Sequence, residues 1–564
     1  MYKALRETWD SLISPGEQFE ITEIKVRGET IKAYANAPPS LREVWQASAQ
    51  FADRDYLVYQ DERWTYADAH RDVAAIAAWF KTQGITSGDR VALALRNYPE
   101  WLLCYWAAVS QGITVVGMNA WWIGEEMRFA LDDSTPKLLI CDQERLDRFN
   151  EIRADFAEMP VVGVRTNDGE DVQPFSVMTN TASELPDASF DPDTDACIFY
   201  TSGTTGRPKG AQLTHRGCVN NIMNLAFAGA AFGAATAIHN GVALPDPADA
   251  PIGSALVTTP LFHVTANNCL THGTTLTGGK LVHMYRWDAE EALKIIEIEK
   301  ITNMTGVPVM SRELIGHPDF DKYDTSTLLS VGGGGAQLQP DLVAKIDKAV
   351  KTARPSTGYG MTETCGIITS ISGDFFLDKP DSCGPAMPNF SAKCIDANGN
   401  DVPQGQVGEL LVKGAPVIKG YLNREQATEE SITNGWLHTG DVARIDEHGF
   451  IFIVDRVKDM VLRGGENIYC AEVESVIFDQ EGVAECSVFG VEDDRLGEEV
   501  GVAIVTKDGS GLTADAIRAH ALANMSKPKV PRYIWMLTES LPRNANGKFL
   551  KRELRDTLKI EDAL

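Results

Sequence analysis

The first 450 residues alternate between two hydrophobic patterns, apolar residues at helical spacing and short continuous apolar runs. This alternation constrains the fold more than any other feature of the sequence. Residues 66–84 carry apolar side chains at helical spacing, and residues 90–95 (RVALAL) form an uninterrupted apolar run. The same pair of patterns recurs, with helical segments at 99–112, 125–133 and 288–302 and apolar strand segments at 113–119, 137–142 and 195–200. Apolar strands that alternate with helices are typical of parallel sheets covered by helices. The sequence therefore predicts an α/β fold, with a large N-terminal domain of parallel or mixed sheets flanked by helices.

The pattern changes after residue 450. Residues 461–478, 483–491 and 501–506 indicate a small α+β unit with its own core. The charged stretch DRVKD (455–459) lies before this unit, and a few residues at such a link can absorb a large dihedral change. We expect an N-terminal domain over residues 1–455, a small, mobile C-terminal domain over residues 456–564, and a hinge near Lys458.

The composition is that of a globular protein, with 44% hydrophobic and 23% charged residues. A formal net charge of −27 disfavours a nucleic-acid partner, and it requires any site for an anionic ligand to be locally positive. The ten cysteines form no CxxC pair, which favours a reducing compartment over a disulfide framework or a zinc cluster. We therefore expect a cytoplasmic protein.

One long stretch, from Cys218 to Pro245, contains no Asp, Glu, Lys or Arg. It is interrupted by asparagines and glycines, and much of its apolar content is alanine, whereas a membrane span needs about 20 strongly apolar residues. The N-terminus also lacks the basic and apolar regions of a signal peptide. We expect a buried helix and loop here and no integral membrane span; peripheral membrane contact and a homodimer stay open.

Residues 200–210, YTSGTTGRPKG, combine glycines, hydroxyl side chains and a lysine after an apolar strand. Glycines allow backbone N–H groups to approach an anion closely, and the hydroxyls and the ammonium group add further donors. The spacing differs from that of the Walker A motif, because a proline precedes the lysine and a glycine follows it. The expected phosphate contacts are Thr201, Ser202, Gly203, Thr204, Thr205, Gly206 and Lys209.

This loop resembles the phosphate-binding signature of the adenylate-forming superfamily, which includes acyl-CoA synthetases, firefly-type luciferases and the adenylation domains of peptide synthetases. Further signatures follow in the family's order over nearly the whole chain: LTHRG (213–217), PLFHV (260–264), GYGMTET (358–364), HTGD (438–441), VDRVKDMVLRGGENIYCAEVE (454–474) and PRNANGKFLKREL (542–554). The resemblance to the acyl-CoA synthetase branch implies that a carboxylate attacks the α-phosphate of ATP, which gives acyl-AMP and pyrophosphate. The acyl group then passes to CoA, with Mg²⁺ as the metal.

The resemblance also implies roles for the GYGMTET segment and for residues outside it. Gly358 and Gly360 are expected to clear a surface for adenine and ribose, with Tyr359 as a stacking face. Thr362 is expected to donate to the α-phosphate, and Glu363 is expected to share Mg²⁺ with Thr201, since Mg²⁺ prefers oxygen ligands. The other expected nucleotide contacts are Gly335, Ala336, Met361, Asp441 and Arg456.

Lys548, in NANGKFLK, matches the family's catalytic lysine. An ammonium group between the carboxylate and the α-phosphate would stabilise the charge that builds during adenylation. The resemblance implies that rotation at Lys458 then removes Lys548 and presents RGGEN (463–467), where Gly464, Gly465 and Glu466 would line the channel for the pantetheine arm of CoA.

The acyl pocket is expected to include Phe262, His263, Gly332, Gly333 and Gly334. Histidine follows Phe262 where amino-acid-activating relatives carry an aspartate, so an amino acid substrate is disfavoured. The uncharged residues 226–253 leave two alternatives, because their small side chains suit either a wide acyl channel or a peripheral loop. We expect an apolar acid, a medium- or long-chain fatty acid first, with an aromatic, steroid or alicyclic acid as the alternative. A luciferase-like oxygenase and a non-catalytic nucleotide-binding protein are the rival functions.

Overall fold

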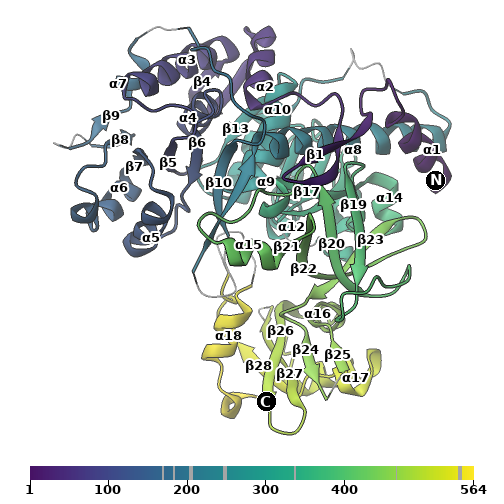
Figure 1. The fold of residues 1–564 in the computed structure, drawn as a ribbon. Helices are drawn as coiled ribbons and strands as arrows, with labels where there is room; N and C mark the ends of the chain where they lie inside the picture. The colour runs from purple at the N-terminus through teal and green to yellow at the C-terminus, as the bar shows by residue number, and fades with distance from the viewer. Residues whose placement is uncertain are drawn as a thin grey trace. The chain divides into compact units, whose positions relative to one another are not determined.

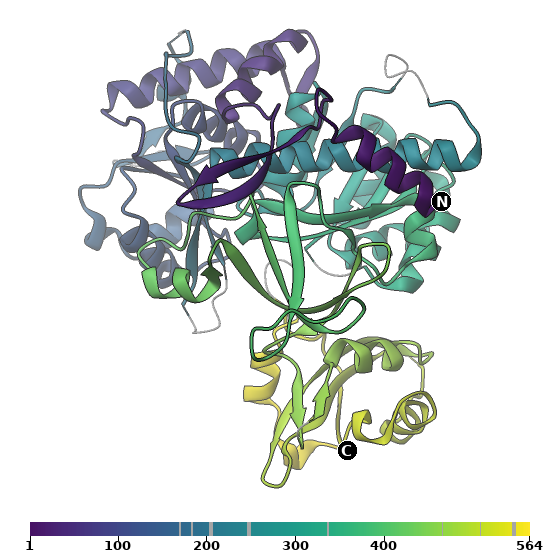
Figure 2. The same ribbon diagram turned by 45° about the vertical axis from the view of Figure 1, so that its right-hand side comes forward.

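The computed structural model describes residues 1–167, 171–181, 184–201, 207–244, 250–335, 338–464, 466–507, 509–543 and 549–564, with the backbone alone for residues 466 and 467. The chain divides into two compact units, the larger formed by Met1–Ser391 with Val412–Leu437 and the smaller by Ala392–Leu411 with His438–Leu564. Both units combine helices and sheets (Figures 1 and 2). The predicted fold class is confirmed, whereas the predicted hinge and the mobility of the small unit stay predictions.

One sheet of the large unit is parallel except at one edge. Its strands lie in the order β11 (Lys209–Thr214), β10 (Asp195–Thr201), β6 (Thr114–Gly117), β5 (Arg90–Ala94), β7 (Leu138–Asp142), β8 (Val161–Val164) and β9 (Gln173–Pro174). The pair β10 and β11 is antiparallel, and every other neighbouring pair is parallel. The uninterrupted apolar runs of the sequence therefore form the buried, parallel part of this sheet.

The second sheet of the large unit has an antiparallel strand at each end. Its order is β17 (Gly366–Ser372), β16 (Arg354–Met361), β15 (Ser330–Gly333), β14 (Asn303–Gly306), β12 (Ser254–Val257), β13 (Lys280–His283), β3 (Asp55–Tyr59) and β4 (Glu62–Thr65). A separate hairpin is formed by β1 (Ile21–Val26) and β2 (Glu29–Tyr34). Several of the expected site residues follow directly after strands of these two sheets in the sequence.

The helices of the large unit are α1 (Tyr2–Leu12), α2 (Leu41–Ala47), α3 (Tyr66–Thr82), α4 (Pro99–Val109), α5 (Gly124–Ser134), α6 (Gln143–Asn150), α7 (Ser176–Thr179), α8 (His215–Asn240), α9 (Val264–Ala266), α10 (His272–Leu276), α11 (Ala289–Glu299), α12 (Pro308–Gly316), α13 (Pro340–Ala349), α14 (Gly373–Asp378) and α15 (Glu425–Ser431). Local sequence explains where they begin. Helix α3 starts at a capping box in which Thr65 Oγ1 accepts from the Asp68 N–H and the Asp68 carboxylate accepts from the Thr65 N–H, both at 3.1 Å.

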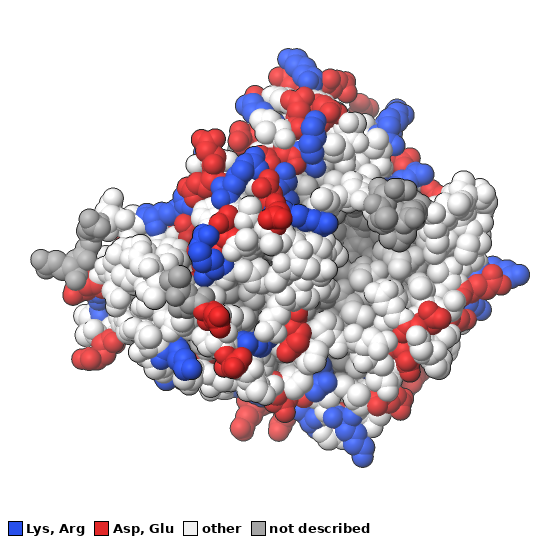
Figure 3. Space-filling model, turned by 90° about the horizontal axis from the view of Figure 1, so that it is seen from above, with Lys and Arg blue, Asp and Glu red and all other residues white. Residues whose placement is uncertain are grey.

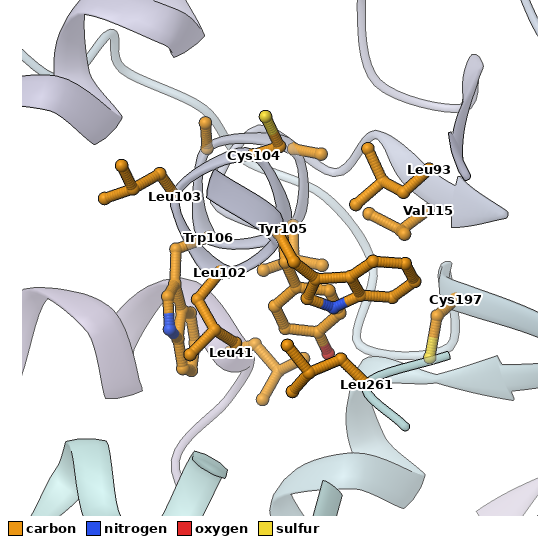
Figure 4. Packing of buried hydrophobic residues seen from close by; sticks show 14 of the residues in the cluster. Leu41, Leu93, Leu102, Leu103, Cys104, Tyr105, Trp106, Val115, Cys197 and Leu261 are labelled. Atoms are coloured by element: carbon orange, nitrogen blue, oxygen red, sulfur yellow. The ribbon is translucent and has the colours of Figure 1, made fainter. Parts of the chain in front are cut away.

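Helix α4 lies in the core, and all of its residues are buried. Figure 4 looks along this helix and shows Leu102, Tyr105 and Trp106 beside Leu41 and Leu261. The Trp106 indole N–H donates to the Tyr56 hydroxyl at 2.8 Å, and that hydroxyl bonds Thr275 Oγ1 at 2.9 Å. A buried indole therefore joins α4, β3 and α10 through satisfied polar atoms.

Helix α8 contains most of the uncharged stretch, and its second half packs against other helices. The Phe227 ring meets Trp9 of α1 at 4.6 Å between centroids, and Phe232 meets Phe375 of α14 at 5.3 Å. In both ribbon views α1 lies beside α8 (Figures 1 and 2). The chain after α8 exposes large apolar side chains, namely Val242, Leu244 and Ile252. Of the two alternatives for residues 226–253, the described residues favour a packed helix and a peripheral loop over an acyl channel.

The length and apolarity of α8 also meet the criteria for a membrane span. Its mean hydropathy reaches 1.4, and half of the most apolar window is buried inside the protein. Among the described residues it is the one helix with this property. A helix in the core of a protein can meet the same criteria, so length and apolarity alone are weak evidence for a span.

The smaller unit has a sheet and a core of its own. Its strands lie in the order β25 (Glu466–Ile468), β24 (Val461–Arg463), β27 (Gly497–Thr506) and β26 (Val483–Asp493), with β28 (Tyr533–Leu537) paired to β27. Its helices are α16 (Cys470–Phe478), α17 (Ala514–Asn524) and α18 (Lys551–Thr557). Val473, Ile477, Val488 and Ile504 are fully buried in its core.

Further strands lie in the part of the chain where the two units alternate. They are β18 (Gly384–Pro385), β19 (Phe390–Ile395), β20 (Gly408–Gly414), β21 (Ile432–Thr433), β22 (Trp436–Ile445) and β23 (Phe450–Arg456). The division between the units falls within β19, β20 and β22. The chain therefore passes between the units more than once.

Charge and cysteine chemistry agree with the composition. All ten cysteines are thiols in the structure. On the face seen in Figure 3, acidic and basic side chains are interspersed, and a broad area carries neither. The distribution of charge on this face does not mark a binding site for an anion. A cation that could bind one therefore has to be identified from its contacts with neighbouring residues.

We expect Trp106→Ala to destabilise the large unit by about 3–5 kcal/mol, because it leaves a cavity in the core and removes a donor to Tyr56. Urea unfolding followed by far-UV circular dichroism measures the change. Trp121→Ala is the matched control, since Trp121 is 45% exposed and its loss should cost less than about 1 kcal/mol. Equal effects of the two variants would contradict the central position of α4 in the core.

Candidate active site

The YTSGTTGRPKG segment forms the connection of a hairpin. Thr201 at the end of β10 lies opposite Lys209 at the start of β11, and the Thr201 hydroxyl donates to the Lys209 carbonyl at 3.5 Å. Ser202, Gly203, Thr204, Thr205 and Gly206 lie outside the described residues. A Walker A loop leads from a strand into a helix, whereas this loop returns to the same sheet. The difference in spacing therefore corresponds to a difference in architecture.

Lys209, Tyr421 and Glu363 form a cluster next to this hairpin. The Lys209 ammonium lies 5.0 Å from the centre of the Tyr421 ring, within cation–π range. The Tyr421 hydroxyl donates to Glu363 Oε1 at 2.8 Å. Burial and the neighbouring Glu363 raise the pKa of Tyr421, which keeps its hydroxyl protonated as a donor. The hairpin and the expected metal ligand are thus joined through one aromatic side chain.

Backbone hydrogen bonds hold Tyr421 in this position. The Leu422 N–H donates to the Gly210 carbonyl at 2.8 Å, and the Ile418 N–H donates to the Glu363 carbonyl at 3.0 Å. Residues 418–422 therefore lie between the hairpin and the turn that carries Glu363. The sequence analysis missed Tyr421, although an aromatic residue after a glycine, in KGYLN, was the available signal.

The chemistry of Glu363 and Thr201 fits Mg²⁺. Glu363 is 8% exposed, and its side chain accepts a hydrogen bond from the neutral Tyr421 hydroxyl, which leaves its negative charge in place. Mg²⁺ takes one or two protein oxygens and completes its shell with phosphates and water. One carboxylate and one hydroxyl near a phosphate loop are sufficient for that coordination, and the sharing of Mg²⁺ by these two residues stays a prediction.

The GYGMTET segment consists of the end of β16 and the 3-10 turn Thr362–Thr364. A Cβ on Gly360 would overlap the carbonyl of Gly366 in the paired strand β17, and a Cβ on Gly358 would meet Ile367 at 3.1 Å. Strand pairing alone therefore explains both glycines, independently of any adenine surface. Tyr359 is half-buried between them, and Thr362 is buried at the turn.

The glycines at the end of β15 and just after it divide into two groups. A Cβ on Gly332 would meet Ser356 Oγ at 2.7 Å, and one on Gly333 would overlap Leu338, so protein atoms occupy the space beside both. Gly334 faces Thr265 at 3.4 Å, and Gly335 has a φ of +75°, which favours glycine. Protein packing therefore accounts for Gly332 and Gly333, whereas space is left beside Gly334, and contact of these glycines with an acyl chain stays a prediction. Ala336 lies outside the described residues.

His263 and Phe262 lie just before Thr265 in the sequence, and Thr265 is the residue that a Cβ on Gly334 would meet. The His263 ring accepts from the Thr265 N–H at 3.3 Å and caps the short helix α9. Phe262 is 8% exposed and meets Trp121 edge to face at 5.5 Å. Three of the residues expected in the acyl pocket, His263, Phe262 and Gly334, thus lie around one turn.

The two expected ribose contacts meet in the smaller unit. Asp441 on β22 lies opposite Arg456 on β23, and the Arg456 Nε lies 3.2 Å from Asp441 Oδ1. Asp441 is 4% exposed. The arginine therefore orients the aspartate, and their contact with ribose stays a prediction.

The expected hinge is an exposed turn between β23 and β24, and both sides of Lys458 belong to the smaller unit. The Asp455 carboxylate accepts from the Cys470 N–H, and from the Arg456 N–H at 2.7 Å, so it joins the two sides of this turn. Burial raises the pKa of Asp455 to about 6.

The expected CoA channel lies farther along the same chain. Gly464 has a φ of +59°, and its N–H donates to the Leu496 carbonyl at 2.7 Å. Glu466 begins β25, and its side chain is not described. Gly465 and Lys548 lie outside the described residues.

The chain matches known proteins over most of its length. Residues 44–422 match the AMP-binding enzyme family, and residues 472–548 match the AMP-binding enzyme C-terminal domain. A feruloyl-CoA synthase of an Amycolatopsis species is 34% identical over 87% of this chain and 93% of its own. A long-chain-fatty-acid–CoA ligase of Escherichia coli is 32% identical over 91% of this chain and 93% of its own.

Solved structures give the same result. ATP-bound MatB from Rhodopseudomonas palustris has a TM-score of 0.80 at 27% identity, covering 92% of this chain and 99% of its own. The o-succinylbenzoate CoA synthetase of Bacillus subtilis, solved with its acyl-adenylate intermediate, has a TM-score of 0.76 at 27% identity and covers 93% and 99%. The chain therefore belongs to the AMP-binding enzyme family, in the branch of the acyl-CoA synthetases, which are AMP-forming acid–thiol ligases.

Proposed function

We propose that this enzyme activates an apolar carboxylic acid as acyl-AMP, with release of pyrophosphate, and then transfers the acyl group to CoA. The observation that supports the proposal most directly is the cluster of Lys209, Tyr421 and Glu363, because it brings a cation and a carboxylate together beside the hairpin whose sequence resembles a phosphate-binding signature. Mg²⁺, when bound, would neutralise charge on the phosphates.

In the first half-reaction, a carboxylate oxygen forms a bond to the α-phosphorus, and the bond between this phosphorus and the bridging oxygen of pyrophosphate breaks. The hairpin loop and Lys209 hold the β- and γ-phosphates as the leaving group. Thr362 donates to an α-phosphate oxygen, and Lys548 stabilises the developing charge. Asp441, oriented by Arg456, accepts from the ribose hydroxyls.

In the second half-reaction, the CoA sulfur attacks the acyl carbonyl as a thiolate, and the bond to AMP breaks. Rotation at Lys458 removes Lys548 from the carbonyl and presents Gly464, Gly465 and Glu466 to the pantetheine arm. With two orientations of the C-terminal domain, one pocket can carry out two reactions that need different residues beside the acyl carbonyl.

The acid is proposed to lie along Phe262, His263 and Gly334. Fatty acids are the first candidates, since a long-chain-fatty-acid–CoA ligase is among the relatives. The described part of residues 226–253 either packs against other helices or is exposed, so it gives a long channel no support. Aromatic acids are therefore a second candidate, and the feruloyl-CoA synthase relative favours them.

A panel of acids tests the function. Fatty acids of increasing length and aromatic acids are each incubated with Mg²⁺ and ATP, with and without CoA, while pyrophosphate and thioester are measured separately. We expect pyrophosphate with a subset of acids and thioester when CoA is present. Light or oxygen uptake would support a luciferase-like oxygenase instead, and no pyrophosphate with any acid would contradict the proposal.

Tyr421→Phe keeps the ring beside Lys209 and removes the hydroxyl that donates to Glu363. Loss of a group that orients a metal ligand commonly weakens metal affinity by about 10- to 100-fold, so the Mg²⁺ concentration for half-maximal pyrophosphate release should rise by about 10-fold or more. Tyr533→Phe, in which the ring lies against Trp535 of the smaller unit, is the matched control. An unchanged Mg²⁺ dependence in Tyr421→Phe would remove Glu363 from the metal site.

Lys458→Pro fixes the backbone at the expected hinge. We expect thioester formation to fall by about 100-fold, as for misplaced reacting groups, while pyrophosphate release falls much less. Lys458→Ala, which keeps the backbone free, should leave both half-reactions near the wild-type rates. If Lys458→Pro slows both half-reactions equally, the hinge assignment is wrong.

A further inference from the structure

Arg96 contacts two aromatic rings near the ends of parallel strands. Its guanidinium lies 4.4 Å from the centre of the Trp121 ring and 4.8 Å from that of Tyr285. The three residues follow β5, β6 and β13, and ligands of α/β proteins bind beyond the carboxyl ends of such strands. Stacking occupies the faces of a guanidinium and leaves its in-plane N–H groups as donors.

These in-plane donors have no acceptor among the described residues. The Arg96 Nε is buried without a hydrogen-bond partner there. Arg165 gives a contrast within the same chain, because it also lies over two rings, those of Tyr59 and Tyr98, yet its guanidinium pairs with Glu62 at 2.6 Å. An arginine stacked on rings can therefore be ion-paired in this protein, and Arg96 is not.

The carboxylates near Arg96 are already engaged. The Arg145 guanidinium lies 2.7 Å from Asp142 and 2.7 Å from Glu144, and Arg148 pairs with the other oxygen of Glu144. Three guanidinium groups and two carboxylates leave one positive charge in this group. The site is thus locally positive in a chain whose formal net charge is −27.

An unpaired, partly buried cation destabilises a folded protein. Burial lowers the pKa of Arg96, which reflects that cost to its charged form. A residue that costs stability without a partner in the chain is typical of a binding site, where the ligand supplies the partner.

Arg96 is connected to the acyl pocket through its neighbours. The Asn97 side chain donates to the Thr259 carbonyl at 3.0 Å and accepts from the Leu261 N–H at 3.1 Å. The Trp121 ring that contacts Arg96 also meets Phe262 at 5.5 Å. One aromatic ring therefore lies between the cation and the expected acyl pocket.

We propose that Arg96 binds an oxyanion of CoA or of the acid, at a point away from the reacting carboxylate. The proposal rests on the proposed function. The anion is a phosphate of CoA or a second carboxylate of the acid, since either accepts two parallel N–H bonds from a guanidinium.

Arg96→Gln tests the proposal by binding and by kinetics. Calorimetric titration with CoA, and with a dicarboxylic acid and its monocarboxylic counterpart in the presence of a non-hydrolysable ATP analogue, needs no turnover. Loss of one charge-assisted contact should weaken the affinity for the anionic ligand by about 10-fold or more. Weaker CoA binding assigns the phosphate, and weaker binding of the dicarboxylic acid alone assigns the second carboxylate.

Two further variants and the wild type separate the possible failures. Arg96→Lys, which keeps the charge and loses the planar fork, should recover part of the affinity. Arg153→Gln removes an arginine that lies over one ring, Phe149, and should bind like the wild type. The melting temperature of Arg96→Gln should equal or exceed that of the wild type, whereas a structural arginine would lower it. Unchanged affinities in Arg96→Gln overturn the inference, while absence of pyrophosphate from the wild type overturns the proposed function instead.

Discussion

The antiparallel pairing of β10 with β11 is the interaction on which the candidate site depends. Register places Thr201 opposite Lys209, so both ends of the phosphate loop are fixed by the sheet. The segment 418–422 then bonds to β11 and to the turn of Glu363. Hydrogen bonds between backbones, made before any ligand binds, thus bring the cation and the carboxylate together. Such preorganisation is what electrostatic stabilisation of a transition state requires.

A strongly acidic chain has to keep some cations available for phosphates. Lys209 lies over Tyr421, and Arg96 lies near Trp121 and Tyr285. In the described parts of the chain neither group forms an ion pair with a carboxylate. An aromatic ring positions a cation through its quadrupole without cancelling the charge, whereas a carboxylate would neutralise it. Aromatic support therefore reconciles the net charge of −27 with the binding of anionic substrates.

The sequence predicted those features that depend on local pattern. The apolar runs at 90–95 and 137–142 became the parallel strands β5 and β7, because a strand buried on both faces has to be apolar throughout. The motif order identified the family, since each motif combines residues with special backbone and charge properties. Helix α3 lies within residues 66–84, which the apolar spacing predicted as helical.

Features that depend on distant contacts were not predictable in this way. The hydrogen bond between Tyr421 and Glu363 spans 58 residues, and no periodicity relates them. Likewise, whether a glycine such as Gly332 faces a ligand or a neighbouring strand depends on Ser356, which lies on another strand. The packing of Phe227 against Trp9, which favours one of the alternatives for residues 226–253, is likewise a contact between distant parts of the chain.

The closed pairing beneath the phosphate loop also bears on how such an enzyme can change over evolutionary time. The ladder runs from Asp195–Thr214 to Thr201–Lys209 and joins the strands that precede and follow residues 202–206 in the sequence. Substitutions in the loop can therefore alter nucleotide handling while the sheet retains its register, because loops on a rigid scaffold tolerate variation. Substitutions that change the chemistry therefore fall at other positions than substitutions that change the folding. In the course of evolution the loop can vary without destabilising the sheet.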